Sequence, residues 1–304
     1  MIQPQNLQPG DLIGIVCPAG TIPAQNVQKC VEMLTSWGYQ VKLGNTVGGK
    51  YFTYSGTDEE RAFDLQQMMD DSSVKAILCG RGGYGLSRII DRLNFSRLKS
   101  SPKWIIGFSD ITILHAALQK NEIMSIHGPM AAAFNKGKEG EPYIQALKNI
   151  LVGIPTSYAA NPHAFNKLGK VTAPMIGGNL CLVAHMIGST NSIDTRGKIL
   201  FLEDTGEFHY NLDRMVIQIK KAGLFEHLAG LVIGGFTDMR DEPNDIGAGA
   251  YEIVQSHLIS YSYPVCYEFP ISHVLANYPI KEGGQYTLDV GATEVILKEA
   301  LIKF

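Results

Sequence analysis

The chain has 304 residues, of which 45% are hydrophobic and 18% are charged, and its formal net charge is -3. This length suffices for two domains, or for one large α/β domain with a substantial core. The charge balance, without a lysine and arginine stripe, argues against a nucleic-acid partner. No apolar run approaches the ~20 residues that a membrane-spanning helix needs.

The N-terminus and the cysteines indicate a cytoplasmic protein. Residues 1–7 have neither the basic region nor the apolar region of a secretory signal. The cysteines are scattered and form no C-x-x-C pair, which fits reduced thiols better than a disulfide framework or a zinc site. We therefore expect no metal and no cofactor. The five cysteines are Cys17, Cys30, Cys79, Cys181 and Cys266.

The first half of the chain alternates predicted strands with predicted helices. Apolar runs predict strands at residues 11–17, 39–43, 74–79, 104–107 and 123–127. Helical periodicity predicts helices at residues 24–37, 86–93, 110–120 and 142–151, and another that begins at a capping box over Thr57–Glu60. This alternation predicts an N-terminal α/β domain with a mainly parallel sheet flanked by helices.

A glycine-rich loop, Gly80–Gly85, follows the third predicted strand. Glycines at the carboxyl end of a strand allow the backbone to approach a ligand closely and to direct amides at an anion. In open α/β sheets, ligands bind at such strand ends. A dinucleotide-binding fingerprint is a rival interpretation, but this loop follows the third strand and not the first. A turn without any ligand is the structural alternative.

A second strand end carries Ser109, between the predicted strand 104–107 and the predicted helix 110–120. A serine at such a corner has its hydroxyl clear of the sheet, and the first amides of the helix point at whatever the hydroxyl attacks. The sequence supplies the first glycine of a G-x-S-x-G elbow, but Ile111 stands where the second would be. The pattern fits a nucleophile, and it also fits a solvated serine that caps a helix.

The second half begins after a stretch without periodicity. Residues 153–170 contain two glycines and two prolines, which predicts a linker between domains at 1–152 and 171–304. Beyond it we expect strands at residues 198–203, 230–234 and 265–269, helices at 182–187, 212–222 and 251–258, and a hairpin of 286–290 with 293–297. The C-terminal domain is therefore predicted to be α/β or mixed β.

A nucleophilic serine needs a base, which is usually a histidine oriented by a carboxylate. Predicted strand ends carry Ser109, then Glu203 or Asp204, then His273, in chain order. His127 also ends a strand, so position alone does not choose between the two histidines. The remaining histidines lack metal-binding spacing. Cys79 beside the glycine loop has no neighbour that would lower its pKa.

Five ordered segments together carry a resemblance to a known family. The chain resembles the LD-carboxypeptidase family of serine peptidases, which also includes the microcin C immunity proteins. The resemblance runs from the first strand to about His273. Its segments are Gly80–Gly85, Ile106–Asp110, Gly177–Leu180, Leu200–Asp204 and Pro270–His273.

The resemblance implies a catalytic triad of Ser109, His273 and Glu203. It implies an oxyanion hole from the amide of Asp110 and an amide of the glycine loop, which we place at Gly83, with Gly82 as the alternative. The serine would belong to the N-terminal domain and the other two residues to the C-terminal domain, so the active site is expected in a cleft between them. The implied activity is removal of the terminal D-alanine from murein tetrapeptides, and the resemblance also implies a homodimer.

The chain departs from the family pattern at two places. Ser272 stands before the histidine, where the family often has glycine, and the stretch Val274–Gly284 is longer than expected and is a candidate for shaping the pocket. A carboxypeptidase must also hold a free carboxylate, and a guanidinium suits that group. Arg81 and Arg240 are the candidates, although a structural or solvated role fits each of them.

Two other functions remain open from the sequence. The first is hydrolysis of peptidyl or acyl-sulfamoyl adenylates, as in the immunity branch, for which Phe236 and Tyr278 are candidate aromatic contacts to the base. The second is a two-domain binding module without catalysis. The preferred diamino acid of the peptide is not specified by the sequence.

Overall fold

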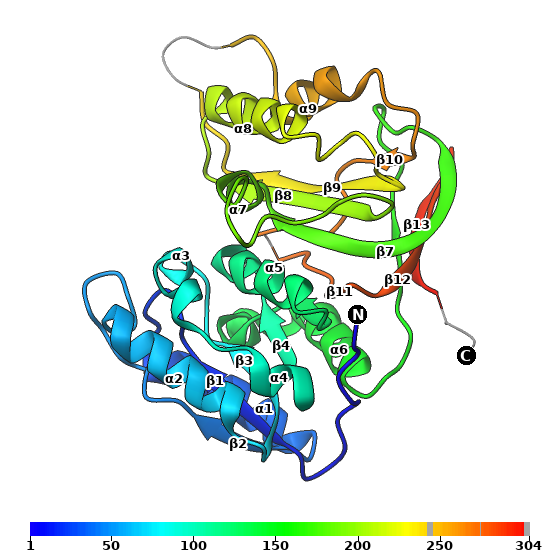
Figure 1. Ribbon diagram of the computed structural model, residues 1–304. Helices are drawn as coiled ribbons and strands as arrows, with labels where there is room; N and C mark the ends of the chain where they lie inside the picture. The colour runs from blue at the N-terminus through cyan, green and yellow to red at the C-terminus, as the bar shows by residue number, and fades with distance from the viewer. Residues whose placement is uncertain (242–245, 274, 301–304) are drawn as a thin grey trace. The chain divides into compact units, whose positions relative to one another are not determined.

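The computed structural model describes residues 1–241, 246–273 and 275–300, and it divides the chain into two units. The first unit comprises Met1–Ile154 together with Tyr278–Gly283, and the second comprises Pro155–Asn277 and Gly284–Phe304. Each unit is built on its own β-sheet with helices packed against it (Figure 1). The predicted two-domain α/β fold class is confirmed.

The sheet of the first unit has six strands in the order β11-β5-β4-β3-β1-β2. Strands β1 to β5 pair in parallel, and β11 is antiparallel to β5. The inner strands are buried apolar runs, as expected for a parallel sheet that is covered on both faces. The strands are β1 (Leu12–Val16), β2 (Gln40–Leu43), β3 (Val74–Cys79), β4 (Trp104–Gly107), β5 (Ser125–His127) and β11 (Ile280–Glu282).

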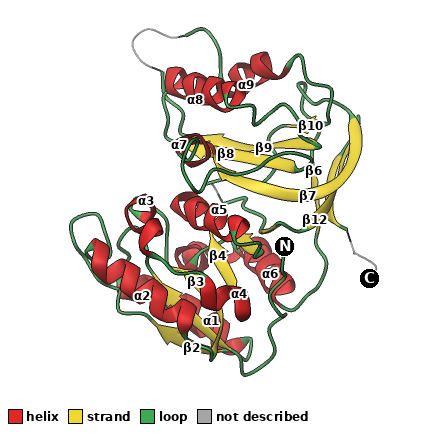
Figure 2. Cartoon of the chain, viewed as in Figure 1, coloured by secondary structure: helices red, strands yellow, loops and turns green. Residues whose placement is uncertain are grey.

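Helices cover both faces of this sheet. Ile15 of β1 belongs to a core that includes Leu34 and Leu147 from two helices, whereas the neighbouring Gly14 faces Met68 from a third helix. Successive strand residues point to opposite faces, so these helices lie on opposite sides. The helices are α1 (Gln28–Ser36), α2 (Asp58–Asp70), α3 (Leu86–Ile89), α4 (Ser96–Ser100), α5 (Thr112–Lys120) and α6 (Glu141–Leu151), shown in red in Figure 2.

The predicted capping box at the start of α2 is confirmed. The Thr57 hydroxyl accepts the N–H of Glu60, and the Glu60 carboxylate accepts the N–H of Thr57. These two bonds satisfy donors that a helix start otherwise leaves without partners.

The sheet of the second unit has seven strands in the order β10-β9-β8-β7-β12-β13-β6. Strands β7 to β10 are parallel, whereas β7, β12, β13 and β6 pair antiparallel, so the sheet is mixed. Helices α8 and α9 pack side by side (Figure 1). The elements are β6 (Ser157–Ala160), β7 (Gly169–Asn179), α7 (Leu180–His185), β8 (Ile199–Thr205), α8 (His209–Lys221), β9 (Gly230–Thr237), α9 (Ala250–Leu258), β10 (Val265–Cys266), β12 (Gln285–Val290) and β13 (Val295–Glu299).

The division between the units differs from the expected ranges 1–152, 153–170 and 171–304. It falls between Ile154 and Pro155, and the expected linker contains the edge strand β6 and the first residues of β7. Only Tyr158 is fully buried in β6, so this strand carries almost no hydrophobic signal.

The stretch after His273 also differs from its predicted loop. Residues 280–282 form β11, in which Ile280 lies opposite His127 and Glu282 lies opposite Ser125. Lys281 and Glu282 are buried although charged, which conceals the strand in a hydrophobicity pattern. The chain therefore re-enters the first unit after most of the second is complete. Val274 lies outside the described residues.

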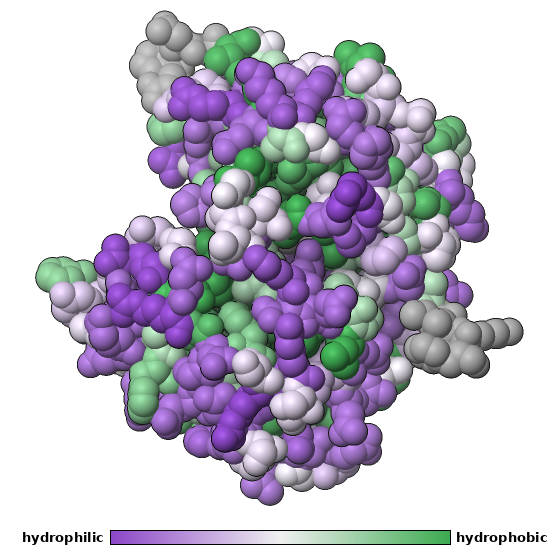
Figure 3. Space-filling view, viewed as in Figure 1, coloured by the Kyte–Doolittle hydropathy of each residue, from purple (hydrophilic) through white to green (hydrophobic). Residues whose placement is uncertain are grey.

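No helix in the described part of the chain is both long and apolar enough to cross a membrane. The face seen in Figure 3 is dominated by hydrophilic side chains, with hydrophobic ones scattered among them. All five cysteines are free thiols, and four are buried. In the same described ranges, no group of three or more histidine, cysteine, aspartate and glutamate side chains is arranged to hold a metal ion.

Candidate active site

Ser109 lies at a strained corner between β4 and α5. Its φ is 64°, in the left-handed region that costs a residue other than glycine roughly 1–3 kcal/mol. The strand before it ends at Gly107, where a Cβ atom would lie 2.8 Å from the Ile111 side chain, so the turn is tight. A strained turn of this kind is typical of a nucleophile elbow, and Ser109 is half-buried there.

A buried histidine holds the end of β4 in front of the serine. The Nε2–H of His115 donates to the carbonyl of Gly107 at 2.8 Å, and the Ser125 hydroxyl donates to Nδ1 at 2.8 Å. Burial lowers the pKa of His115 to about 4, so the ring is neutral at pH 7. Because both ring nitrogens are engaged, His115 supports the corner and does not act as its base.

The glycine loop lies directly against the serine. A Cβ atom at Gly82 would lie 2.9 Å from the Ser109 hydroxyl oxygen and 3.4 Å from the amide nitrogen of Asp110. The neighbouring Gly83 is exposed and has a φ of 110°. The first unit therefore brings together the serine and both groups that were expected to form the oxyanion hole.

Asp110 also fixes the far end of this loop. Its buried carboxylate accepts the N–H of Leu86 at 2.8 Å, and Leu86 is the first residue of α3. The residue that follows the serine thus holds the loop that faces the serine. No pattern in the sequence predicts this side-chain contact.

In the second unit, His273 contacts Glu203. The histidine Nδ1–H donates to the Glu203 carboxylate at 2.5 Å, and Glu203 is fully buried on β8. With Nδ1 protonated, a neutral ring carries its lone pair on Nε2, which is the nitrogen that a general base uses. Burial lowers the pKa of His273, but the Glu203 hydrogen bond and the charges of Glu203 and Asp204 outweigh that effect and raise it above its ordinary value.

Asp204, the other candidate carboxylate, has different partners. It accepts hydrogen bonds from the Asn179 side chain at 2.7 Å and from the amides of Cys181 and Thr205 at 3.0 and 2.8 Å. Burial, followed by the charge of Glu203, raises the pKa of Asp204 to about 7. Of the two carboxylates, Glu203 is therefore the one that orients the histidine.

Two other histidine–carboxylate pairs, His209–Asp241 and His257–Asp213, are close at 2.5 and 2.6 Å. Their carboxylate side chains are 47% and 39% exposed, whereas that of Glu203 is 0% exposed. Water and salt weaken exposed charge pairs. Burial therefore separates the Glu203 pair from these two surface pairs.

The serine before His273 fits the backbone without strain. Ser272 is absent from the described residues with a positive φ, so the chain does not require glycine there. Its hydroxyl donates to the carbonyl of Ala276 at 3.2 Å and closes the loop that follows the histidine. The departure from the family pattern at this position is thus accommodated.

Sequence comparison connects this geometry to a family. The profile described as the LD-carboxypeptidase N-terminal domain matches residues 13–128, and that of the C-terminal domain matches residues 172–288. A probable murein peptide carboxypeptidase from Bacillus subtilis (strain 168) is 30% identical over 300 residues, which cover 97% of this chain and 94% of that protein. The chain belongs to the LD-carboxypeptidase family.

Solved structures agree with this membership. A muramoyltetrapeptide carboxypeptidase from Oxalobacter formigenes has a TM-score of 0.87 at 28% identity, over 96% of this chain and 100% of that one. The microcin C7 self immunity protein MccF has a TM-score of 0.88 at 22% identity and full coverage of both chains, which shows a shared fold. The resemblance found in the sequence is thereby confirmed.

In this LD-carboxypeptidase family member, each half of the expected site is assembled within its own unit. Ser109, Asp110 and the glycine loop lie in the segment that matches the N-terminal domain. Glu203 and His273 lie in the segment that matches the C-terminal domain. The family matches therefore include every residue of the expected triad.

The rival nucleophile and base are both buried. His127 lies on β5 opposite Gly107, with its ring packed against Phe108 at 5.9 Å between centroids. Cys79 is fully buried, and burial raises the pKa of its thiol far above the ordinary value. A thiol that stays protonated is a poor nucleophile.

The glycines at positions 80, 82 and 85 also have the G-x-G-x-x-G spacing of a dinucleotide fingerprint. In the structure, however, Gly82 packs against Ser109, and the helix that follows the loop has only four residues. The loop therefore lacks the long helix N-terminus on which a dinucleotide pyrophosphate rests.

The two arginines that are candidates for binding the substrate carboxylate lie in different units. Arg81 is exposed and donates to the Thr21 carbonyl at 3.3 Å in the first unit, whereas the guanidinium of the exposed Arg240 lies 5.9 Å from the ring centroid of Phe208 in the second.

The two aromatic residues that are candidates for contacting a nucleotide base also lie in different units. Phe236 lies opposite Asp204 and packs on Tyr251 in the second unit, whereas Tyr278 packs on Tyr143 in the first. Phe236 is thus adjacent to the strand end that carries the carboxylates.

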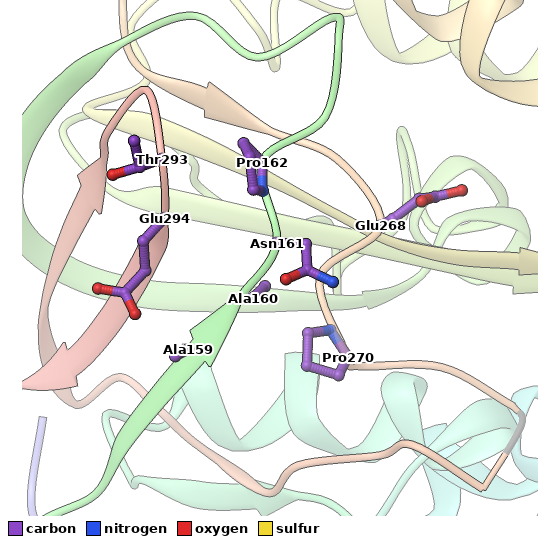
Figure 4. Close-up of a pocket in the computed structure, with 8 residues that line it drawn as sticks. All are labelled: Ala159, Ala160, Asn161, Pro162, Glu268, Pro270, Thr293 and Glu294. Carbon is purple, nitrogen blue, oxygen red and sulfur yellow. The ribbon is translucent and has the colours of Figure 1, made fainter.

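A polar pocket of about 400 Å³ lies in the second unit (Figure 4). The carboxylates of Glu268 and Glu294 lie on opposite sides of Asn161 in this view. None of the residues that line it belongs to the expected triad, so it is not the candidate active site. Its lining residues are Ala159, Ala160, Asn161, Pro162, Glu268, Pro270, Thr293 and Glu294.

Proposed function

We propose that this family member is a serine LD-carboxypeptidase that releases the terminal D-alanine of murein tetrapeptides by hydrolysing the L,D-peptide bond. The observation that carries the proposal is the hydrogen bond from His273 to the buried Glu203, in a chain whose relatives bear murein peptide carboxypeptidase names. A buried carboxylate on Nδ1 is what a histidine needs in order to act as a general base.

The proposed reaction begins when His273 Nε2 takes the proton of Ser109 as the hydroxyl oxygen attacks the peptide carbonyl. Glu203 stabilises the imidazolium, and the amides of Asp110 and Gly83 hydrogen-bond to the oxyanion. When the C–N bond breaks, His273 returns the proton to the amine of the departing D-alanine. Water then cleaves the acyl-enzyme ester by the same base, which regenerates Ser109.

The course of the chain supports the participation of His273. Strand β11 starts with Ile280 opposite His127, at the carboxyl end of β5, and β5 is the neighbour of the strand that leads to Ser109. Ile280 follows His273 by seven residues in the chain. The sheet that bears the serine thus takes its last strand from the segment that comes directly after the histidine.

The free carboxylate of the substrate requires a cation. We propose Arg81 and Arg240 as the candidates, because both are exposed and a guanidinium binds a carboxylate through two parallel hydrogen bonds. Separate Arg81→Gln and Arg240→Gln variants identify the residue: the correct change raises KM for the tetrapeptide, whereas a change that leaves KM unaltered excludes that arginine.

We also propose that the protein acts in the cytoplasm, and that it is a homodimer, as the family resemblance implies. Five free thiols fit a reducing compartment. Light scattering of the purified protein measures the mass against the 33.3 kDa of one chain, and cell fractionation tests the location. A monomeric mass or a secreted protein would contradict the corresponding statement.

The decisive test is turnover of a purified murein tetrapeptide, with released D-alanine as the readout. Ser109→Ala is expected to lower kcat by roughly 10⁴–10⁶, the range seen when a triad member is removed. Ser100→Ala is the matched control, because its hydroxyl is exposed and only caps a helix end.

Other outcomes of the same test identify the alternatives. Preferential cleavage of a peptidyl-adenylate analogue would favour the immunity-type hydrolase. Binding of the tetrapeptide without turnover, and without labelling of Ser109 by a fluorophosphonate, would favour a binding module.

A further inference from the structure

We infer that a hydrogen bond from Gly20 to the glycine loop, held in place by the buried Arg61, makes Gly83 and not Gly82 the second oxyanion donor. The inference rests on the proposed serine mechanism and assigns Arg61 a role in positioning that donor. Neither Gly20 nor Arg61 belongs to the expected catalytic set.

The orientation of the peptide between Gly82 and Gly83 is fixed from one side. The N–H of Gly20 donates to the carbonyl of Gly82 at 3.0 Å. Cis peptide bonds are absent from the described chain, and in a trans peptide the N–H points opposite to the carbonyl. The N–H of Gly83 is therefore directed away from the turn that contains Gly20.

The two glycines differ in what their surroundings permit. Gly83 is exposed, and its N–H donates to no group of the described residues, whereas Gly82 is buried against the serine. A donor that has no protein partner and is open to solvent is ready to bind a substrate oxygen. Gly83 meets both conditions.

The peptide between Gly82 and Gly83 starts at the residue that packs against Ser109. A Cβ atom at Gly82 would lie 2.8 Å from the Ser109 Cβ and 3.4 Å from the Asp110 nitrogen. The peptide that carries the outward N–H of Gly83 thus starts beside both the serine and the first oxyanion donor. Two amides can therefore serve one oxygen only while this peptide keeps its orientation.

Arg61 ties the Gly20 turn to the glycine loop. Its Nη1 donates to the carbonyl of Pro18 at 2.7 Å and to that of Gly85 at 3.0 Å. Pro18 precedes Gly20 by two residues, and Gly85 follows Gly83 by two residues, so one guanidinium holds both partners of the orienting hydrogen bond. The planar, multivalent donor set of arginine suits this bridge, and lysine lacks it.

The burial of Arg61 sets its position. The side chain is fully buried, and its charge is compensated by Asp58 at 2.5 Å. A third bond runs from Nε to the carbonyl of Gly56 at 3.2 Å, and the guanidinium lies 4.9 Å from the ring centroid of Tyr54. A group restrained in this way holds the turn and the loop at one separation.

The glycine at position 20 is explained by the same contact. Its φ is not positive, so backbone conformation does not demand glycine there. A Cβ atom at this position would, however, lie 2.8 Å from the carbonyl oxygen of Gly82. Glycine is needed so that the turn can approach the carbonyl that orients the oxyanion peptide.

The first test is Gly20→Ala, whose added methyl displaces the Gly82 carbonyl and rotates the peptide. The expected result is a fall in kcat of about 10²–10³, the loss that accompanies removal of one oxyanion donor, with KM little changed. Affinity for a peptidyl boronate, whose tetrahedral adduct on Ser109 mimics the intermediate, should fall by the same factor. Affinity for the tripeptide product should not change.

Gly14→Ala is the matched control. It adds the same methyl on β1, the strand that leads to the Gly20 turn, where it would lie 2.8 Å from the flexible Met68 sulfur and not from a backbone carbonyl. Its melting temperature reports the cost of the extra methyl, and its kcat should remain that of the wild type.

The second test is Arg61→Lys, with Arg88→Lys as the control, because Arg88 pairs with the same carboxylate of Asp58 at 2.8 Å but is half exposed. Arg61→Lys should lower kcat and boronate affinity together, whereas Arg88→Lys should lower neither. If Arg61→Lys does not fold, the result for Gly20→Ala decides whether the inference holds.

The outcomes separate this inference from the proposed function. A wild type that is inactive on the tetrapeptide but phosphonylated at Ser109 contradicts the substrate, and the phosphonylation rate of Gly20→Ala then tests the inference. Full kcat and full boronate affinity in Gly20→Ala would overturn the inference, as would equal losses for the boronate and the tripeptide. A wild type that is not phosphonylated would overturn both.

Discussion

The charge state of His273 should govern the pH dependence of the reaction. The imidazole must be neutral to accept the serine proton, and its pKa is raised by Glu203 and Asp204 against the effect of burial. In Glu203→Gln the ring of His273 no longer donates to a charged carboxylate while burial remains, so the pKa of His273 falls. The acidic limb of the kcat/KM profile should therefore move to lower pH, while kcat falls by about 10⁴, as when the carboxylate of a Ser-His-Asp triad is neutralised.

Glu294→Gln is the control for this change, because Glu294 is an exposed carboxylate of the pocket in Figure 4. Its pH profile should coincide with that of the wild type. An acidic limb that stays in place in Glu203→Gln would show that another group titrates.

The neighbouring Asp204 should make the fold less stable as the pH rises. Its pKa in the folded protein is raised to about 7 from 3.8, because burial and the charge of Glu203 oppose ionisation. The folded state therefore binds a proton more tightly, and its stability relative to the unfolded chain is lost as the pH rises from about 4 to about 7. The shift corresponds to a contribution on the order of 4 kcal/mol.

Urea denaturation at several pH values measures this contribution. In Asp204→Asn the part of the slope that belongs to Asp204 should disappear between pH 4 and 7, whatever the change in absolute stability. An unchanged slope would show that Asp204 is not the group whose proton affinity changes on folding.

For single residues, the sequence predicts which ones belong to the candidate site better than it predicts which side chains they contact. Ser109 and His273 can be predicted as site residues because each follows an apolar run and a turn. Both also lie in segments that carry the family resemblance. The choice between Glu203 and Asp204 depends on which way each side chain of a strand end points, and local pattern does not encode that contact. Arg61 shares the buried face of α2 with Leu65 and Met68, and this spacing indicates a buried charge.

Helix α2 is the element that supports the glycine loop, because it carries Arg61, the residue that follows its capping box. Thr57→Ala removes the acceptor for the Glu60 amide and should lower the free energy of unfolding by about 1 kcal/mol, within a range of roughly 0.5–2. The denaturation midpoint should fall while the m-value stays constant.

Thr57→Ser is the control for α2, since serine keeps the hydroxyl that caps the helix. It should lie close to the wild type in stability. A loss as large as that of Thr57→Ala would mean that the threonine methyl, and not the cap, stabilises this end.

The other strands could be predicted from the sequence where their hydrophobic residues form one regular pattern. The strands β1 to β5 and β8 are found near their predicted positions, because buried parallel strands are apolar runs bounded by turns. The strands β6, β7 and β11 were not predicted. Strand β6 buries a single tyrosine and β11 buries charged residues, whereas β7 begins with alternating exposed positions and has two glycines before its last residue. The pairing partners of β6 and β11 lie more than 100 residues away, so no local window contains the cause.

For the whole molecule, the chain passes between the units three times, after Ile154, Asn277 and Gly283. The expected model of two consecutive domains joined by one linker accounts for only the first passage. Since β11 supplies the outer strand beside β5, the first unit is incomplete until residues near the end of the chain have been made. Folding of the two units should accordingly be coupled, with one denaturation transition for the full chain.

A fragment of residues 1–154 tests this dependence. Without β11, strand β5 presents unpaired backbone groups at a sheet edge, which favours aggregation. A second fragment, in which residues 277–284 follow residue 154 through a glycine-serine linker, should be soluble and more stable. Restored hydrogen bonds at about 1 kcal/mol each, and the buried Ile280 side chain at about 2 kcal/mol, give the expected gain.

The control for these fragments is the extended one with Ile280→Asp, which keeps the length of the chain but not the buried side chain. It should behave like residues 1–154 alone in sedimentation and in urea denaturation. If residues 1–154 fold alone with the stability of the extended fragment, the first unit does not need β11 in order to be stable. If they do not, the sheet that carries Ser109 depends on the segment that follows His273. A change in that segment should then alter the positions of both Ser109 and His273.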